Sequence, residues 1–547
     1  MTGSAPSSHI AEAHLRGDPV MPCAAHAPVL HLRHGPAGVA LSGTAMARLG
    51  HRPTPPDTGL GLHAGWEWDG SSLAAEVDAL GYFSLFYYIK GSEIAVSPSI
   101  LRILALGVDA EPDPVALAVF HRLGHFLGED TPFRHIRVLP PAGRLVWRNG
   151  QATVSGDLPI PREAGLSRSQ AVEAFIEVPR AAIRRFLADW DGPIVLPLSG
   201  GRDSRHILLE MLHQGRKPDF AATFHQGGRV LDREVQAARA VTERAGVRHG
   251  LLGHPRSRLR DAVRAIFLTQ FCADEHAQMM PMHDYLAGTP GVAAMDGIGG
   301  DILTNPDDSA AGFLDLARKG DYDGIARRLA AGHGSVISRP GHLGGAGAIH
   351  SPELEEAAIA RIAEAIRAFD DAPDPYQAFW FWNRTRREIA FVSTAILGPA
   401  ARVGCPFLSP EFVELGLSLP FAVTRDQRLH DDAIALAYPA FADIPYAEGF
   451  RNPPLPPLPR LRVSRAVNVI DGLRMAVLAE PDRPLTAMRH LLARQPLRRR
   501  TADIYRLHDR FVTTMDADEA RRLIALEDRL QRTAPKGERV VSDVFGA

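Results

Sequence analysis

The residues best suited to chemistry in this chain lie together at positions 199–204, which read Ser-Gly-Gly-Arg-Asp-Ser. The apolar run before them, residues 193–198, is too short for a helix and predicts a buried strand, and residues 205–209 continue with helical spacing. A strand, a glycine turn and a helix start bring several backbone N–H groups to one point, where the helix dipole favours negative charge. Asp203 would repel a phosphate on its own, so the pattern indicates a phosphate site that includes Mg²⁺.

The elements around this turn predict how it is held. Apolar runs at residues 219–224, 248–252 and 291–295 follow the first strand and alternate with helical segments. This alternation predicts an α/β fold with a parallel sheet and helices on both of its faces. Ligands of such sheets bind at the carboxyl ends of the strands, which is where residues 199–204 lie. The alternative is a glycine-rich turn of an ordinary α/β domain that binds no ligand.

Residues 199–204 resemble the SGGxDS pyrophosphate loop of the N-type ATP pyrophosphatases, in particular the synthetase domain of the asparagine synthetase family. Two further segments match that family in the same order. Residues 296–301, Asp-Gly-Ile-Gly-Gly-Asp, lie where the family has a second glycine loop, and residues 401–413 resemble its segment around Pro-Phe-Leu. The resemblance implies a doubly wound parallel-sheet domain over residues 167–453, with a helical C-terminal part, that binds ATP and Mg²⁺.

The resemblance also implies roles for individual residues. Asp203 and Asp301 match the two family aspartates that share Mg²⁺, and we expect both to serve catalysis. The residues expected to bind ATP are Leu198, Ser199, Gly200, Gly201, Asp203, Ser204, Thr223, Phe224 and Gly297. A substrate carboxylate would attack the α-phosphate of ATP and release pyrophosphate, and an amine would then capture the acyl-adenylate.

The second loop departs from the family at two positions. Ile298 stands where the family has a glutamate, or a tyrosine in some antibiotic-forming relatives, and Asp296 stands where it has a serine. Isoleucine neither binds an amine nor moves a proton, so another residue must supply the base. Glu275 and His276 are the candidates, since the family's helix at this point borders the acceptor pocket; the alternative is that both are solvated helix charges.

A family lysine that steadies pyrophosphate also has no counterpart here. Residues 445–451, which take its place, contain no lysine. Arg451 or Arg428 can supply positive charge to a phosphate, and we expect Arg451 to take the catalytic role. Neither arginine can act as a base, so proton transfer must differ from that of the family.

The N-terminal part has a different pattern of apolar residues. Residues 25–152 consist of short apolar runs that suit strands, with a hairpin predicted within residues 81–97. Residues 127–143 are similar to the end of the glutaminase-type domain of asparagine synthetases. Active members expose a cysteine at the mature N-terminus, whereas position 2 is Thr2 and the first cysteine is Cys23. We therefore expect a degenerate glutaminase-like, β-rich α+β domain that does not hydrolyse glutamine.

Length, charge and cysteine content limit the number of domains and the class of protein. Its 547 residues suffice for two or three domains, and a net charge of −2 gives no general attraction to nucleic acid or to a membrane. Three scattered cysteines indicate neither a disulfide framework nor a zinc site. With no signal peptide and no long apolar run, we expect a cytoplasmic protein. Residues 1–24 are expected to be disordered, and residues 460–547 to form a helical extension.

Residues 376–387 interleave aromatic side chains with arginines. Such a segment can bind nucleic acid. With a neutral chain we expect the rings to pack in the core and the arginines to face solvent or phosphates.

These observations lead us to expect an ATP-dependent carbon–nitrogen ligase. It would adenylate a small-molecule or peptide carboxylate and transfer the acyl group to an amine, as β-lactam synthetases and the macrolactam-forming cyclases of lasso peptides do, with a biosynthetic partner protein as a further expectation. One alternative is a catalytically weakened ATP-binding scaffold, and another is an asparagine synthetase that uses glutamine or ammonia. A tRNA-modifying relative is disfavoured, because it requires a basic face.

Overall fold

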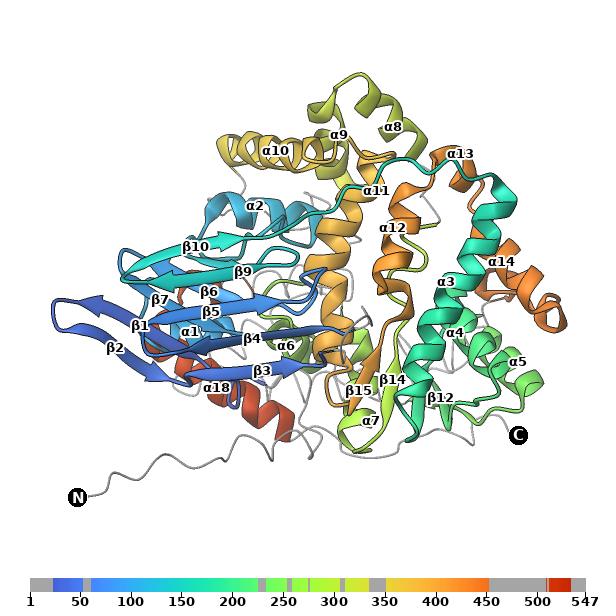
Figure 1. Ribbon diagram of the computed structural model, residues 1–547, viewed down its shortest axis with the longest axis horizontal. Helices are drawn as coiled ribbons and strands as arrows, with labels where there is room; N and C mark the ends of the chain where they lie inside the picture. Colours follow the sequence, from blue (N-terminus) through green and yellow to red (C-terminus); the bar gives the residue numbers. More distant parts are fainter. Residues whose placement is uncertain are drawn as a thin grey trace, which may run out of the picture.

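The computed structural model (Figure 1) describes residues 23–52, 61–224, 233–252, 258–273, 276–304, 310–333, 351–451, 508 and 511–532. Within these residues no helix combines the length and the apolar character needed to cross a bilayer. The expected disorder of residues 1–24 falls almost wholly outside the described residues, as do residues 460–507 and 533–547 of the expected C-terminal extension.

The N-terminal part contains two antiparallel five-stranded sheets, seen on the left of Figure 1. The first has the order β2-β1-β7-β6-β8, with bounds Gly38–Gly43, Leu30–Gly35, Glu93–Ser97, Phe86–Lys90 and Ile136–Val138. The second has the order β10-β9-β5-β4-β3, with bounds Gln151–Ser155, Arg144–Arg148, Ser72–Val77, His63–Trp68 and Met46–Gly50. Buried residues of both sheets belong to one continuous hydrophobic core.

Strand sequences explain which face of these sheets is buried. In β9 the side chains of Leu145 and Trp147 are fully buried, while their neighbours along the strand are exposed, as expected for a half-buried strand of period two. The predicted hairpin is confirmed: Phe86 pairs with Ser97 and Lys90 with Glu93 in antiparallel register. Its turn contains Gly91 at φ +60°, a left-handed conformation that glycine adopts without strain.

The predicted parallel sheet is also confirmed. It has the order β13-β12-β11-β14-β15, with bounds His249–Leu252, Phe220–Phe224, Ile194–Pro197, Ala293–Met295 and Arg402–Gly404, and every pair of neighbours is parallel. The chain leaves β11 toward β12 and β13 on one side and returns to β14 on the other. The carboxyl ends of β11 and β14 are therefore adjacent at the point where the strand order reverses, the usual ligand position in such sheets.

The helices near this sheet begin and end at recognisable signals. They are α3 (Arg168–Ala188), α4 (Arg202–His213), α5 (Arg233–Ala245), α6 (Arg258–Leu268) and α7 (Met280–Ala287). Ser167 caps α3 in a reciprocal pair with Gln170. In α4 the residues Ile207, Leu208 and Met211 are fully buried, so apolar packing adds to the turn that starts this helix.

A helical part follows the second loop, with α10 (Pro352–Arg367), α11 (Pro375–Trp380), α12 (Pro410–Ser418) and α14 (Leu429–Ala437). Beyond α11 the helix continues in wider π-type turns over Phe381–Ile389. Its rings are buried as expected. The expectation that its arginines face solvent or phosphates is wrong for Arg386 and Arg387, which are 2% exposed.

These two arginines join the helical part to the N-terminal part. Arg387 donates to the carbonyl oxygens of Gly128 and Asp130 at 3.1 and 2.7 Å, and Arg386 donates to that of Leu139 at 3.0 Å. Each guanidinium thereby satisfies carbonyl groups that burial removes from water.

The C-terminal helix α18 (Ala517–Arg532), red in Figure 1, lies with the N-terminal part and packs against α1 (Ile100–Leu104) and α6. Its buried face contains Leu523, Leu526 and Leu530. The main-chain N–H of Ala24 donates to the carboxylate of Glu527 at 3.1 Å, so the first described residues are held by the last helix of the described part of the chain.

Candidate functional site

Two loops meet at the carboxyl ends of β11 and β14. The first glycine loop is residues 199–204, which follow β11 and start α4, and the second glycine loop is residues 296–301, which follow β14. The main-chain N–H of Asp301 donates to Oδ2 of Asp203 at 3.3 Å. The two aspartates proposed as magnesium ligands are therefore brought together from loops 98 residues apart.

Glycines of the second loop make this approach possible. A Cβ atom built on Gly300 would lie 2.5 Å from Oδ1 of Asp203, and one built on Gly297 would lie 2.6 Å from Cβ of Asp203. Contacts that short do not occur in folded proteins, so any larger residue at either position would displace the aspartate. Gly299 adds a φ of +96°, which turns the loop back onto its neighbour.

Three carboxyl groups lie close together in this site, those of Asp203, Asp296 and Asp301. Burial raises the pKa of Asp203 well above its usual value, and the nearby charges of Asp301 and Asp296 raise it further. Asp296 accepts a hydrogen bond from Oγ of Ser393 at 2.6 Å, and burial raises the pKa of Asp296 as well. A cation would relieve this repulsion and favour the ionised forms.

These carboxylates fit Mg²⁺ in kind and in number. The buried Oδ1 of Asp203 has no hydrogen-bond donor among the described residues. Mg²⁺ is bound through one or two carboxylates together with substrate phosphate oxygens and water, so Asp203 and Asp301 suffice as protein ligands.

The backbone N–H groups of the first glycine loop already have oxygen acceptors. The N–H of Ser199 donates to Oγ of Ser204, and that of Gly201 donates to Oγ of Ser199, both at 3.1 Å. The N–H of Gly200 donates to Oε2 of Glu234, at the start of α5, at 2.6 Å. An anionic oxygen thus occupies one N–H of this loop, and a phosphate on the same group would have to replace it.

Two arginines of α4 hold α14 and the segment that follows it. Arg202 forms a bidentate ion pair with Asp431, at 2.5 and 3.1 Å. Arg205 donates to the carbonyl oxygens of Ile444 and Pro445, and its guanidinium lies 4.0 Å from the ring centroid of Tyr446. Among the loop's own residues, Arg202 is the cation available to a nearby phosphate.

This arrangement brings residues 445–451 against the first glycine loop. The N–H of Ala447 donates to the carbonyl oxygen of Gly200 at 3.1 Å, so the segment expected to replace the family lysine does border the loop. Arg451 is exposed, and its carbonyl oxygen accepts a hydrogen bond from Gln236 on α5.

The remaining residues expected to bind ATP lie at the strand ends. Leu198 is buried, and its main-chain N–H donates to the carbonyl oxygen of Ala222 on β12. Oγ1 of Thr223 donates to the carbonyl oxygen of Leu198 at 2.7 Å, and Phe224, the last residue of β12, is half-buried. Thr223 therefore braces the backbone that leads into the first glycine loop.

Of the two residues expected to supply the missing base, Glu275 and His276, the structure describes only His276. Glu275 lies outside the described residues. His276 is buried, and its Nε2 lies 2.8 Å from the carbonyl oxygen of Glu388, so it is not the solvated helix charge that was the alternative. Ile298 is buried in the core.

Three side chains near the two glycine loops were not identified from the sequence. Glu234 lies in the first turn of α5, and nothing in its sequence neighbourhood marks it as a partner of Gly200. His206 and His430 are buried polar side chains within otherwise apolar helix faces. A histidine at such positions is the one signal that could have drawn attention to them.

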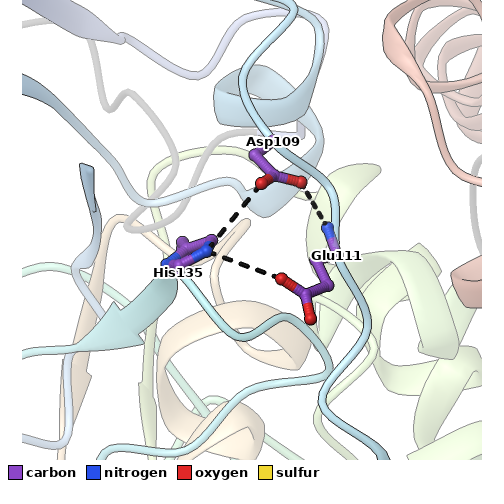
Figure 2. A group of neighbouring side chains, drawn as sticks. All are labelled: Asp109, Glu111 and His135. Atoms are coloured by element: carbon purple, nitrogen blue, oxygen red, sulfur yellow. Dashed lines mark hydrogen bonds and ion pairs between the residues drawn. The ribbon is translucent and has the colours of Figure 1, made fainter. Parts of the chain in front are cut away.

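A second group of side chains has metal-ligand chemistry, far from the loops in sequence. In the described part of the chain, ligand atoms of Asp109, Glu111 and His135 lie within 4.8 Å of one another (Figure 2). Lys90 is ion-paired with Asp109, however, and Arg134 with Glu111. These cations already balance the carboxylates, so we interpret the group as a surface ion-pair network.

A comparison with protein-family models finds no matching family, and a comparison with curated proteins finds no matching relative.

Proposed function

We propose that this protein is an ATP-dependent carbon–nitrogen ligase that adenylates a substrate carboxylate, releases pyrophosphate and transfers the acyl group to an amine. The observation that supports this most directly is the contact of Asp203 with the second glycine loop, where Gly297 and Gly300 leave room for its carboxylate. Two carboxylates from separate strand ends beside a serine–glycine loop are suited to a metal-bound phosphate chain.

In this proposal each part of the site has a defined task. Asp203 and Asp301 hold Mg²⁺, which supplies positive charge to the phosphate oxygens. Ser199 and Ser204 donate their hydroxyl hydrogens to the departing pyrophosphate, which stabilises its developing charge. Arg202 adds positive charge beside the loop, although its pairing with Asp431 limits its reach. The base that deprotonates the amine comes from a residue other than Ile298.

The finer assignment is part of the same proposal. Residues 167–453 would be a synthetase domain similar to that of the asparagine synthetase family, and residues 25–152 a degenerate glutaminase-like domain. Because a degenerate domain of this kind would not hydrolyse glutamine, the amine would be one other than ammonia from glutamine. A peptide or small-molecule substrate that carries its own amine fits this reasoning best.

The exchange of labelled pyrophosphate into ATP tests adenylation. A panel of amino acids, dicarboxylates and short peptides supplies the carboxylate, and exchange should depend on Mg²⁺. Asp203→Asn should abolish exchange, because it removes a charge at the metal. Asp443→Asn is the matched control, since Asp443 is an exposed aspartate paired with Arg244 on the far end of α5, and it should exchange like the wild type. Exchange that survives Asp203→Asn refutes the proposal.

Two observations favour a second candidate, a nucleotide-binding scaffold without catalysis. The carboxylate of Glu234 occupies the N–H of Gly200, and Ile298 provides no base. Calorimetry with Mg²⁺ and a non-hydrolysable ATP analogue separates the two candidates. Binding without exchange for any carboxylate of the panel would favour the scaffold.

A further inference from the structure

Arg202 is a cation inside the first glycine loop, where it is the first residue of α4. The dipole of a helix places partial positive charge at that end, so a cation there is unfavourable unless an anion lies beside it. The position of Arg202 therefore gives no benefit to the helix itself. It suits a side chain that meets anions at the loop.

The anion that Arg202 meets in this structure is a carboxylate of the protein. Nε of Arg202 donates to Oδ1 of Asp431 at 2.5 Å, and Nη2 donates to Oδ2 at 3.1 Å. Nη1 lies 3.5 Å from Oε1 of Glu448, and the guanidinium lies 4.6 Å from the ring centroid of Tyr446. A carboxylate offers two oxygens to the guanidinium fork in the same way as a phosphate group does.

This ion pair can open, because water reaches both side chains. The side chain of Arg202 is 24% exposed and that of Asp431 is 26% exposed. Ion pairs of this kind are weak, so another anion can replace the carboxylate. Arg205, three residues further along α4, is different: it is buried and donates to main-chain carbonyl oxygens, which cannot rotate away.

Asp431 does not need Arg202 for its own stability. It lies in the first turn of α14, where the helix dipole favours an anion. When the pair opens, Asp431 is therefore a partly hydrated carboxylate at a favourable position, rather than a buried charge without a partner. The exchange of one anion for another at Arg202 costs little on the side of the protein.

The charge of the candidate site calls for a cation in addition to the metal. Asp203 and Asp301, when ionised, carry two negative charges, which one Mg²⁺ balances. A phosphate chain then still requires positive charge, and residues 445–451 contain no lysine. The same residues touch the loop through Ala447, and the guanidinium of Arg202 packs on their Tyr446, so this cation lies beside the loop.

We propose that Asp431 is an internal counter-ion of the site, and that Arg202 exchanges the carboxylate of Asp431 for oxygens of the departing pyrophosphate. One ion pair opens and another forms, and no covalent bond changes. Asp431 thereby keeps the guanidinium at the loop while the site is empty, and it competes with pyrophosphate for Arg202. This inference rests on the proposed function, because that function supplies the pyrophosphate.

Calorimetry of the full-length protein with inorganic pyrophosphate and Mg²⁺ tests the exchange without a chemical step. Arg202→Gln should weaken binding about tenfold, because a charged donor is lost. Asp431→Asn should tighten binding about threefold, because Arg202 no longer has an anionic partner to leave. Combined with Arg202→Gln, Asp431→Asn should change the affinity very little, since the two residues act on each other.

Asp432→Asn is the matched control for the charge of Asp431. Asp432 is the next residue of α14 and pairs with Arg168 at 2.7 Å, so this variant removes the same charge from the same turn but leaves Arg202 paired. Its affinity for pyrophosphate should equal that of the wild type. Equal tightening in Asp431→Asn and Asp432→Asn would show a general effect of charge and would overturn the proposal.

Three other results would also overturn it: weaker binding in Asp431→Asn, unchanged binding in Arg202→Gln, or no binding of pyrophosphate by the wild type. Failure of the proposed function has a different signature. Pyrophosphate would then bind with the expected pattern among the variants, while no carboxylate would support the exchange of labelled pyrophosphate into ATP.

Discussion

Replacing Gly300 by alanine tests the contact between the loops most directly. The new Cβ would lie 2.5 Å from Oδ1 and 2.8 Å from Cγ of Asp203, whereas ordinary contacts begin at 3.4 Å. The carboxylate must therefore retreat by about 0.9 Å. A misplacement of about 1 Å in a catalytic group costs on the order of 100-fold in rate. Because the φ of Gly300 is not positive, alanine adds no backbone strain, and the effect is confined to this contact.

We expect Gly300→Ala to lower pyrophosphate exchange about 100-fold and to raise the Mg²⁺ requirement for nucleotide binding. The overpacking should also cost about 1–3 kcal/mol of unfolding free energy, measured by chemical denaturation, so the variant remains folded. Gly165→Ala is the matched control, because a Cβ at Gly165 meets no atom within 4 Å. Wild-type exchange and wild-type Mg²⁺ dependence in Gly300→Ala would refute the assignment of Asp203 to the metal.

Three further predictions concern charge and burial. Burial raises the pKa of Glu527 to about 7, so the folded protein keeps a proton that the unfolded chain releases above about pH 4.5. Between these two pH values the free energy of unfolding of the wild type should fall by about 3 kcal/mol relative to that of Glu527→Gln, measured by denaturation at several pH values. The same pH dependence in both proteins would contradict this prediction. Glu234→Gln keeps an acceptor for the N–H of Gly200 but removes the charge, so calorimetry should show severalfold tighter binding of the ATP analogue; weaker binding would mean that the charge supports the loop. Arg387→Met removes the donor to the carbonyl of Asp130 and one of two donors to that of Gly128, the other being Arg386, and should cost about 2 kcal/mol in urea denaturation. A loss below about 0.5 kcal/mol would contradict the role of Arg387 in joining the two parts.

The local part of this fold could be predicted because its signals are local. A short apolar run before Ser199 and a helical pattern after Asp203 define a strand, a turn and a helix without knowledge of any distant residue. The same holds for the hairpin of β6 and β7. The meeting of the two glycine loops was expected from the family resemblance, and it depends on the strand order, which places β14 beside β11.

The parts that escaped prediction depend on which helices pack together. His430 lies 224 residues from His206, and no local pattern pairs them. Arg386 and Arg387 were expected to face solvent or phosphates, yet they are buried and donate to carbonyl groups more than 240 residues away. Buried polar contacts of this kind become visible only when the tertiary arrangement is known.

The return of α18 to the N-terminal part has a consequence for synthesis on the ribosome. Ala24 and Glu527 are separated by 503 residues, so the first sheets to leave the ribosome cannot obtain this contact until these further residues have been synthesised. At ordinary elongation rates the delay is on the order of a minute. During that time the apolar surface destined for Leu523, Leu526 and Leu530 stays uncovered, which makes the nascent chain a natural client for chaperones.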